Sequence, residues 1–239
     1  MDAKEVDAKE VEEKLRSRGY WRVVIRPSAF IAERARLRDL EQIARDSVVQ
    51  LRGWDYPHFP HDGVTRGNDF IEALTDSGWI QHIELWRLYQ SGQFVHLFAM
   101  REDWLEGVPV PGPGIVKPGT LLSYESTLYT ITEIFLFSAR LAQRMALGPE
   151  VIVEYSLVDL LNRKLETFNP RRDSLFLTPR ATTLGHSYER SVTQKTERLV
   201  GGAPEIALEQ TLDLFERFGW DTSKQSLEDE QRKFLERRL

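Results

Sequence analysis

The sequence contains no cysteine. Disulfide bonds, thiolate metal ligands and cysteine nucleophiles are therefore excluded. It also lacks a Walker A phosphate loop, a GxGxxG fingerprint after a predicted strand and a GxSxG nucleophile elbow. These absences argue against an ATPase, a dinucleotide-dependent enzyme or an α/β-hydrolase. Enzymes that carry no short motif are not excluded, although we lean against catalysis.

Long uncharged apolar runs are missing as well. The most apolar region, 120–147, is interrupted by four charged residues, Glu125, Glu133, Arg140 and Arg144. We therefore predict no membrane-spanning helix and no membrane partner. The first residues, MDAKEVDAKEVEEK, are highly charged and lack the apolar core of a secretory signal. We expect a cytoplasmic protein.

The composition is that of an ordinary globular protein, with 239 residues, 41% hydrophobic and 29% charged. We predict a charged helix over 1–19, a single α+β domain over 20–220 and a charged, helical tail over 221–239. A run rich in proline and glycine, 107–119, is predicted to be a flap. Two prolines and two glycines mark 52–63 as a loop.

The clearest structural signal is a β-hairpin over 79–103. Two runs rich in β-branched and aromatic residues flank Ser91-Gly92, which we predict to be a two-residue turn. This turn sets the register, so that Leu88 would pair with Val95 and Trp86 with Leu97. Because both faces are mostly apolar, we expect the hairpin at the centre of a sheet that is covered on both sides.

The remaining elements complete an antiparallel-dominated α+β fold. We predict 151–160 and 164–168 to form a second hairpin, and Gly201-Gly202 to open the helix that ends at Gly219. The other predicted strands are 20–26, 47–54 and 187–193. The other predicted helices are 32–45, 68–74 and 121–147.

The predicted hairpin carries charged side chains into apolar surroundings. Its register places Glu84 on one face and Arg87 with His96 on the other. A buried charge needs a partner, so we hypothesise a Glu133–Arg87–His96 cluster where the 121–147 helix meets the sheet. Such a cluster is either a structural ion pair or part of a ligand pocket.

The 52–63 loop, RGWDYPHFPHDG, combines aromatic residues with histidine and aspartate. Aromatic walls with few polar groups are typical of ligand pockets. We predict a pocket between residues 54–62 of this loop and the hairpin, covered by the 107–119 flap. The candidate ligand-binding residues are Trp54, Asp55, His58, Glu84, Arg87, His96 and Glu133.

The same loop offers an alternative, a metal-dependent hydrolase. His58, His61 and Asp62, with Asp55 upstream, are residue types that bind divalent metals. However, the HExxH context is absent, and histidines and aspartates in loops often cap backbone groups instead. We therefore expect no metal and no cofactor.

A second alternative is nucleic-acid binding. The net charge of −5 argues against a protein that coats nucleic acid but leaves a local basic patch open. Candidate phosphate-binding residues are Arg171, Arg172, Arg180, Arg190 and Arg198, near the aromatic Phe176 and Tyr188. Interspersed acidic residues, Asp173, Glu189 and Glu197, favour a solvated surface of mixed charge.

The order of several segments resembles a known family. These segments are WRVVIRP, LRGWDYPHF, HIELWRLYQSGQFVH, YTITEIFLFSARLA and RFGW, which span about 21–220. Together they resemble a poorly characterised bacterial region that accompanies Schlafen-like AlbA-2 domains, in proteins labelled as nucleic-acid-binding or ATP-binding. The AlbA-2 domain itself is not evident here, so its chemistry cannot be carried over.

The resemblance implies a sensor, adaptor or assembly module in a bacterial stress or defence setting, and it assigns no functional residue. Our overall prediction is a non-catalytic binding or regulatory module. Its ligand is unknown, and its partner would be another protein or a second copy of the chain. Nucleic-acid binding is less favoured.

Overall fold

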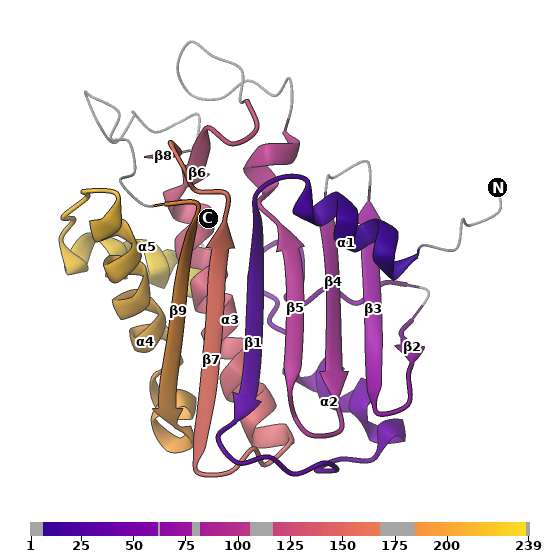
Figure 1. Ribbon diagram of the computed structural model, residues 1–239. Helices are drawn as coiled ribbons and strands as arrows, with labels where there is room; N and C mark the ends of the chain where they lie inside the picture. The colour runs from indigo at the N-terminus through magenta and orange to yellow at the C-terminus, as the bar shows by residue number, and fades with distance from the viewer. Residues whose placement is uncertain (1–6, 62, 78–81, 106–116, 168–184, 238–239) are drawn as a thin grey trace.

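The computed structural model describes residues 7–61, 63–77, 82–105, 117–167 and 185–237. Within these ranges, seven strands form one sheet in the order β2-β3-β4-β5-β1-β7-β9, and each neighbouring pair is antiparallel (Figure 1). The strands are β1 (Tyr20–Pro27), β2 (Thr65–Arg66), β3 (Phe70–Ser77), β4 (His82–Tyr89), β5 (Phe94–Ala99), β7 (Glu150–Val158) and β9 (Ser187–Lys195). The predicted α+β class and the central position of the hairpin are confirmed.

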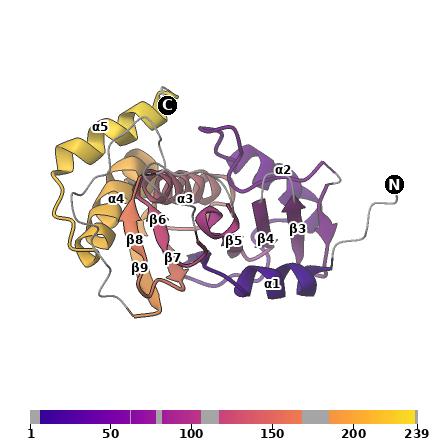
Figure 2. The same ribbon diagram turned by 90° about the horizontal axis from the view of Figure 1, so that it is seen from above.

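Helices cover the two faces of the sheet unequally. Figure 2 shows α1 (Ala8–Arg16) on one side and α2 (Leu40–Ser47), α3 (Tyr124–Arg144) and α4 (Thr196–Arg217) on the other. Successive side chains of a strand point to opposite faces of the sheet, so Trp21, Val23 and Ile25 of β1 all point to one face. These three residues belong to the large core beneath α3. Val11 and Leu15 of α1 bury a smaller cluster on the opposite face. No helix in the described ranges is long and apolar enough to cross a membrane.

The hairpin turn differs from the prediction. Tyr89 N–H donates to Gln93 O at 2.9 Å, so the loop has three residues, Gln90, Ser91 and Gly92. Gly92 has φ +87°, a left-handed conformation that typically ends such three-residue loops. The predicted two-residue turn is therefore wrong, and the two strands pair one residue out of the expected register.

This one-residue shift places the side chains of β5 on the opposite face relative to those of β4. Trp86 pairs with His96, and Glu84 pairs with Phe98. His96 therefore lies on the same face as Glu84, under α3, whereas Arg87 pairs with Val95 and lies on the other face. Because both faces are apolar, the hydrophobic pattern could not choose between the two registers.

Three other predicted elements are also wrong in type or extent. The 47–54 strand is reduced to a single bridge between Val49 and Tyr56. The 68–74 helix is instead β3, which pairs along its whole length with β4. The 32–45 helix is confined to a 3₁₀ turn, Leu37–Asp39, followed by α2. In each case tertiary pairing or packing decided against a weak local preference.

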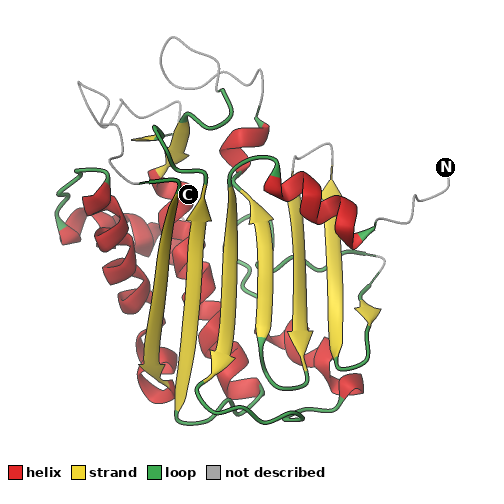
Figure 3. Cartoon of the chain, viewed as in Figure 1, coloured by secondary structure: helices red, strands yellow, loops and turns green. Residues whose placement is uncertain are grey.

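The second predicted hairpin is wrong as well. β8 (Lys164–Glu166) pairs in parallel with β6 (Leu121–Ser123), and it does not pair with β7. α4 begins five residues before Gly201, and its backbone leaves helical geometry at Gly202. The predicted helical tail forms α5 (Lys224–Leu235), a helix on the same side of the sheet as α3 and α4 (Figure 3), and it packs on both of them. There Phe234 stacks on Tyr129 with ring centroids 4.2 Å apart.

Several predicted features lie outside the described residues. They are Trp79 at the start of the hairpin, Asp62, most of the 107–119 flap, and Arg171, Arg172, Phe176 and Arg180.

Candidate functional site

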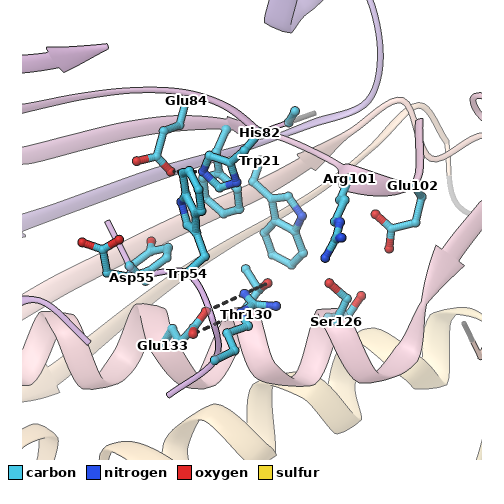
Figure 4. A pocket seen from close by; sticks show the side chains of 15 residues that line it. Trp21, Trp54, Asp55, His82, Glu84, Arg101, Glu102, Ser126, Thr130 and Glu133 are labelled. Carbon is cyan, nitrogen blue, oxygen red and sulfur yellow. Dashed lines mark hydrogen bonds and ion pairs between the residues drawn. The ribbon is translucent and has the colours of Figure 1, made fainter. Parts of the chain in front are cut away.

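A pocket of about 100 Å³ lies between the central strands and α3. Figure 4 shows that the sheet forms one wall and α3 the opposite wall, with Trp54 and Asp55 of the 51–60 segment at one end. Arg101 and Ser126 lie at the other end. The structure therefore has a pocket at the predicted position, beside the 54–62 loop and the hairpin.

The sheet register builds one wall of this pocket. Trp21 pairs with Phe98, and Phe98 pairs with Glu84, so the three residues lie side by side on β1, β5 and β4. Trp21 and Phe98 stack with ring centroids 5.8 Å apart. The wall thus places a buried carboxylate next to two aromatic rings.

Glu84 is the most heavily coordinated charge at the site. It is 2% exposed, and its Oε1 accepts the backbone N–H of His58 at 2.7 Å. Its Oε2 lies 2.7 Å from His82 Nε2 and 3.4 Å from His96 Nε2. Burial alone would raise the pKa of Glu84, but the charge and hydrogen bond of His82, together with His96, hold that pKa well below its usual range.

Glu133 is the buried charge on the opposite wall. It is 0% exposed, and its carboxylate is bound by Arg52 through Nε at 3.1 Å and Nη2 at 2.5 Å. Thr130 also accepts a hydrogen bond from Arg52, at 3.0 Å. Burial raises the pKa of Glu133, and Arg52 opposes this rise. The 51–60 segment is therefore joined to α3 by a two-hydrogen-bond ion pair.

Trp54 and His82 form the third wall, and His58 packs against Trp54. His58 Nδ1 lies 2.6 Å from Asp55 Oδ1. The Trp54 ring contacts both the His58 and the His82 rings, with centroids 4.0 and 4.3 Å away. The carboxylates Asp55 and Glu84 therefore orient the two imidazoles, and the imidazoles hold the indole in place.

Three polar side chains that line the pocket have no hydrogen-bond partner in the described part of the chain. They are Trp54 through Nε1, Tyr56 through its hydroxyl and Thr127 through Oγ1. Tyr56 is 5% exposed and Thr127 is 1% exposed. Burial, with the nearby Glu133 and Glu84 charges, raises the pKa of the Tyr56 hydroxyl well above its usual range. The phenol is therefore neutral and able to donate.

The structure assembles only part of the predicted site. Trp54, Asp55, Glu84 and Glu133 line the pocket. His58 supports its wall, and His96 is fully buried against Glu84. The hypothesised Glu133–Arg87–His96 cluster is wrong, because Glu133 pairs with Arg52 and Arg87 forms an ion pair with Glu72 on the other face of the sheet.

Several site residues were missed by sequence reasoning. They are Arg52, Tyr56, His82, Arg101, Thr127 and Thr130. One signal could have found the threonines: Thr127, Thr130 and Glu133 recur at intervals of three on an apolar helix and so share one face. The others come from the loop and from strand ends, where periodicity carries no information about which side chains converge.

The described residues give little support to the two alternative sites. No group of three or more potential metal ligands occurs among them, although His61 lines an open groove of about 670 Å³ together with Asp55 and His58. Arg190 and Arg198 lie 3.4 and 3.8 Å from Asp213 and Glu209, so their charges are balanced.

Comparison of the chain with protein-family models, with curated proteins and with solved structures found no match. The resemblance to the region that accompanies AlbA-2 domains therefore stays a prediction, and the residues of the pocket are the basis for a function.

The Glu84 cluster makes a prediction about pH. Because the pKa of Glu84 is lower in the folded than in the unfolded protein, its charge stabilises the fold above the ordinary carboxyl pKa, and this contribution is lost as the pH falls toward the folded-state pKa. The difference in unfolding free energy between the wild type and Glu84→Gln should therefore shrink below about pH 5, by at most about 1.4 kcal/mol per pH unit. Urea titrations between about pH 5 and pH 3 measure it. A difference that is constant over this range would show that Glu84 is not stabilised by charge.

Proposed function

We propose that the protein is a ligand-binding regulatory module, and that its ligand is a small organic molecule held between the central strands and α3. The observation that carries this proposal is the set of unpartnered polar atoms of Trp54, Tyr56 and Thr127 around one pocket. A buried polar group without a partner costs about 1–3 kcal/mol. A ligand that bonds to these atoms would recover that cost.

The walls of the pocket have the features of a small-molecule binding site. Trp21, Trp54, Tyr56 and Phe98 supply aromatic surface, and paired charges such as Arg52–Glu133 fix the polar groups between them. The imidazoles of His58 and His82 already bond to carboxylates, which gives them an orienting role. We therefore propose binding rather than catalysis.

The resemblance to the AlbA-2-associated region suggests where such binding would act. In a bacterial stress or defence protein, a module of this kind would serve as a sensor or adaptor. Ligand binding would join the loop, the sheet and α3, and a change in their packing would be the signal passed to a partner.

A screen of single-ring compounds by ligand-observed NMR tests the proposal. We expect compounds that bind the wild type to lose binding at least about tenfold in Ser126→Phe, because the added ring occupies a pocket this small. The matched control is Gln143→Phe, which places the same side chain on the exposed part of α3, away from the pocket. Urea unfolding of each variant verifies that it is folded.

The binding data for the two variants distinguish a ligand site from an empty pocket. Binding that is lost in Ser126→Phe and retained in Gln143→Phe supports the proposal. If no compound binds the wild type, or if both folded variants bind as the wild type does, the pocket is not a ligand site and the proposal fails.

A further inference from the structure

The hydrogen-bonding groups of the pocket are unequally occupied. Its acceptor-only groups are the four carboxylates Asp55, Glu84, Glu102 and Glu133. Each already accepts a hydrogen bond within the protein. The donors are His58 to Asp55, the His58 backbone and His82 to Glu84, the Ser123 backbone to Glu102, and Arg52 to Glu133. Every carboxylate of the pocket therefore already has a donor within the protein.

The donor-only groups are in the opposite state. Trp54 Nε1 is buried without an acceptor, and Arg101, an exposed side chain at the pocket rim, forms no ion pair or hydrogen bond within the ranges that the structure covers. Tyr56 and Thr127 add two unpartnered hydroxyls that can donate. The free capacity of the pocket therefore favours a ligand that supplies acceptors.

Arg101 indicates that the acceptor group of the ligand is anionic and that it binds at one end of the pocket. It lies at the opposite end of the pocket from Glu84, beside Ser126 in the first turn of α3 (Figure 4). A free guanidinium recognises a carboxylate through two parallel hydrogen bonds. The neighbouring Glu102 is 4% exposed, and burial raises its pKa.

The size and walls of the pocket limit the rest of the ligand. A space of about 100 Å³ is of the order of cavities that hold one benzene ring. The aromatic rings of Trp21, Trp54 and Phe98 favour contact with a flat, apolar group. One six-membered ring with one anionic substituent fits these limits.

We infer that the pocket selects a small aromatic carboxylate, with its ring among the aromatic side chains and its carboxylate bound by Arg101. This inference rests on the proposed ligand-binding function and adds the chemical class of the ligand.

Three probes of the same shape but different charge test the inference: benzoate, benzamide and benzamidine. We expect benzoate to bind the wild type at least about tenfold more tightly than the other two, as measured by quenching of tryptophan fluorescence and by ligand-observed NMR. Arg101→Gln should weaken benzoate binding by about tenfold, the loss expected for a charge-assisted hydrogen bond. Tyr56→Phe should weaken it several-fold without changing the order of the three probes.

Arg22→Gln is the matched control, because it removes the same charge from an exposed position on β1 that faces away from the pocket. It should leave benzoate binding unchanged, which excludes a general effect of protein charge.

Other results would overturn the inference. If benzamide or benzamidine binds as well as benzoate, or if Arg101→Gln has no effect, the ligand class is wrong while the proposed function stands. If none of the three probes binds but other single-ring compounds do, the class is again wrong and the function stands. If no compound of any kind binds, both the ligand class and the proposed function are wrong.

Discussion

Replacing Arg163 with methionine is expected to lower the free energy of unfolding by about 3–5 kcal/mol, the usual cost of removing one partner of a buried ion pair. Arg163 is 0% exposed, and its two Nη atoms contact the two oxygens of Asp103 at 2.7 and 2.5 Å. Asp103 also accepts the backbone N–H groups of Gly19 and Gly119. The Asp103 side chain, held by Arg163, therefore links the residue before β1, the Arg101–Trp104 turn and the segment before β6. Urea denaturation measures the change.

A matched substitution on the surface controls for the change of side chain. Arg26 pairs with Glu154 at 2.8 Å, but its side chain is 40% exposed. Arg26→Met should cost less than about 1 kcal/mol, since water screens an exposed pair. Equal losses in Arg163→Met and Arg26→Met would show that burial of the Arg163–Asp103 pair does not matter for stability.

Replacing Arg52 with methionine should make the stability of the protein depend steeply on pH. Glu133 would remain buried without its cation, so its pKa, already raised by burial, would rise further. A pKa that is higher in the folded protein stabilises the fold below the unfolded-state pKa, and this stability is lost as the pH rises toward the folded-state pKa. From about pH 5 to pH 8 the variant should lose up to about 1.4 kcal/mol per pH unit relative to the wild type, and about 3–4 kcal/mol in total.

The double variant Arg52→Met with Glu133→Gln isolates the carboxylate. With no ionisable group left at position 133, the added pH dependence should disappear, even if some stability is still lost. Urea titrations at several pH values compare the two variants with the wild type. A slope that persists in the double variant would assign the effect to another group and would contradict the proposed role of Arg52.

The two ion pairs show why the site could be predicted only in part. Sequence reasoning correctly expected that Glu133, a carboxylate on an apolar helix, needs a cation. It chose Arg87, which lies on a strand with a strong signal, and overlooked Arg52, which lies in a loop between two prolines and a helix. Which arginine reaches Glu133 depends on the path of that loop, and the path is set by contacts such as the Val49–Tyr56 bridge and the bond from His58 to Glu84.

The register of the hairpin could also not be predicted from the sequence, and the prediction was wrong by one residue. Its existence and central position followed from two β-rich runs around a glycine. Its register depended on whether the loop has two residues or three, and Gly92 suits the last position of either loop. The shift of one residue moved His96 to the face of Glu84 and left Arg87 on the other face, so that His96 rather than Arg87 lies beside Glu84.

The sequence by itself determined the class of this protein: a cysteine-free α+β chain with a central apolar hairpin, a long buried helix and a loop rich in aromatic, histidine and aspartate residues. These features follow from composition and from local periodicity, which act over a few residues. Only the tertiary structure decided the strand register, the partners of the buried charges and the pocket with unpartnered donors. These depend on contacts between segments distant in sequence, such as Arg52 with Glu133 or Trp21 with Phe98, and no local pattern encodes such contacts.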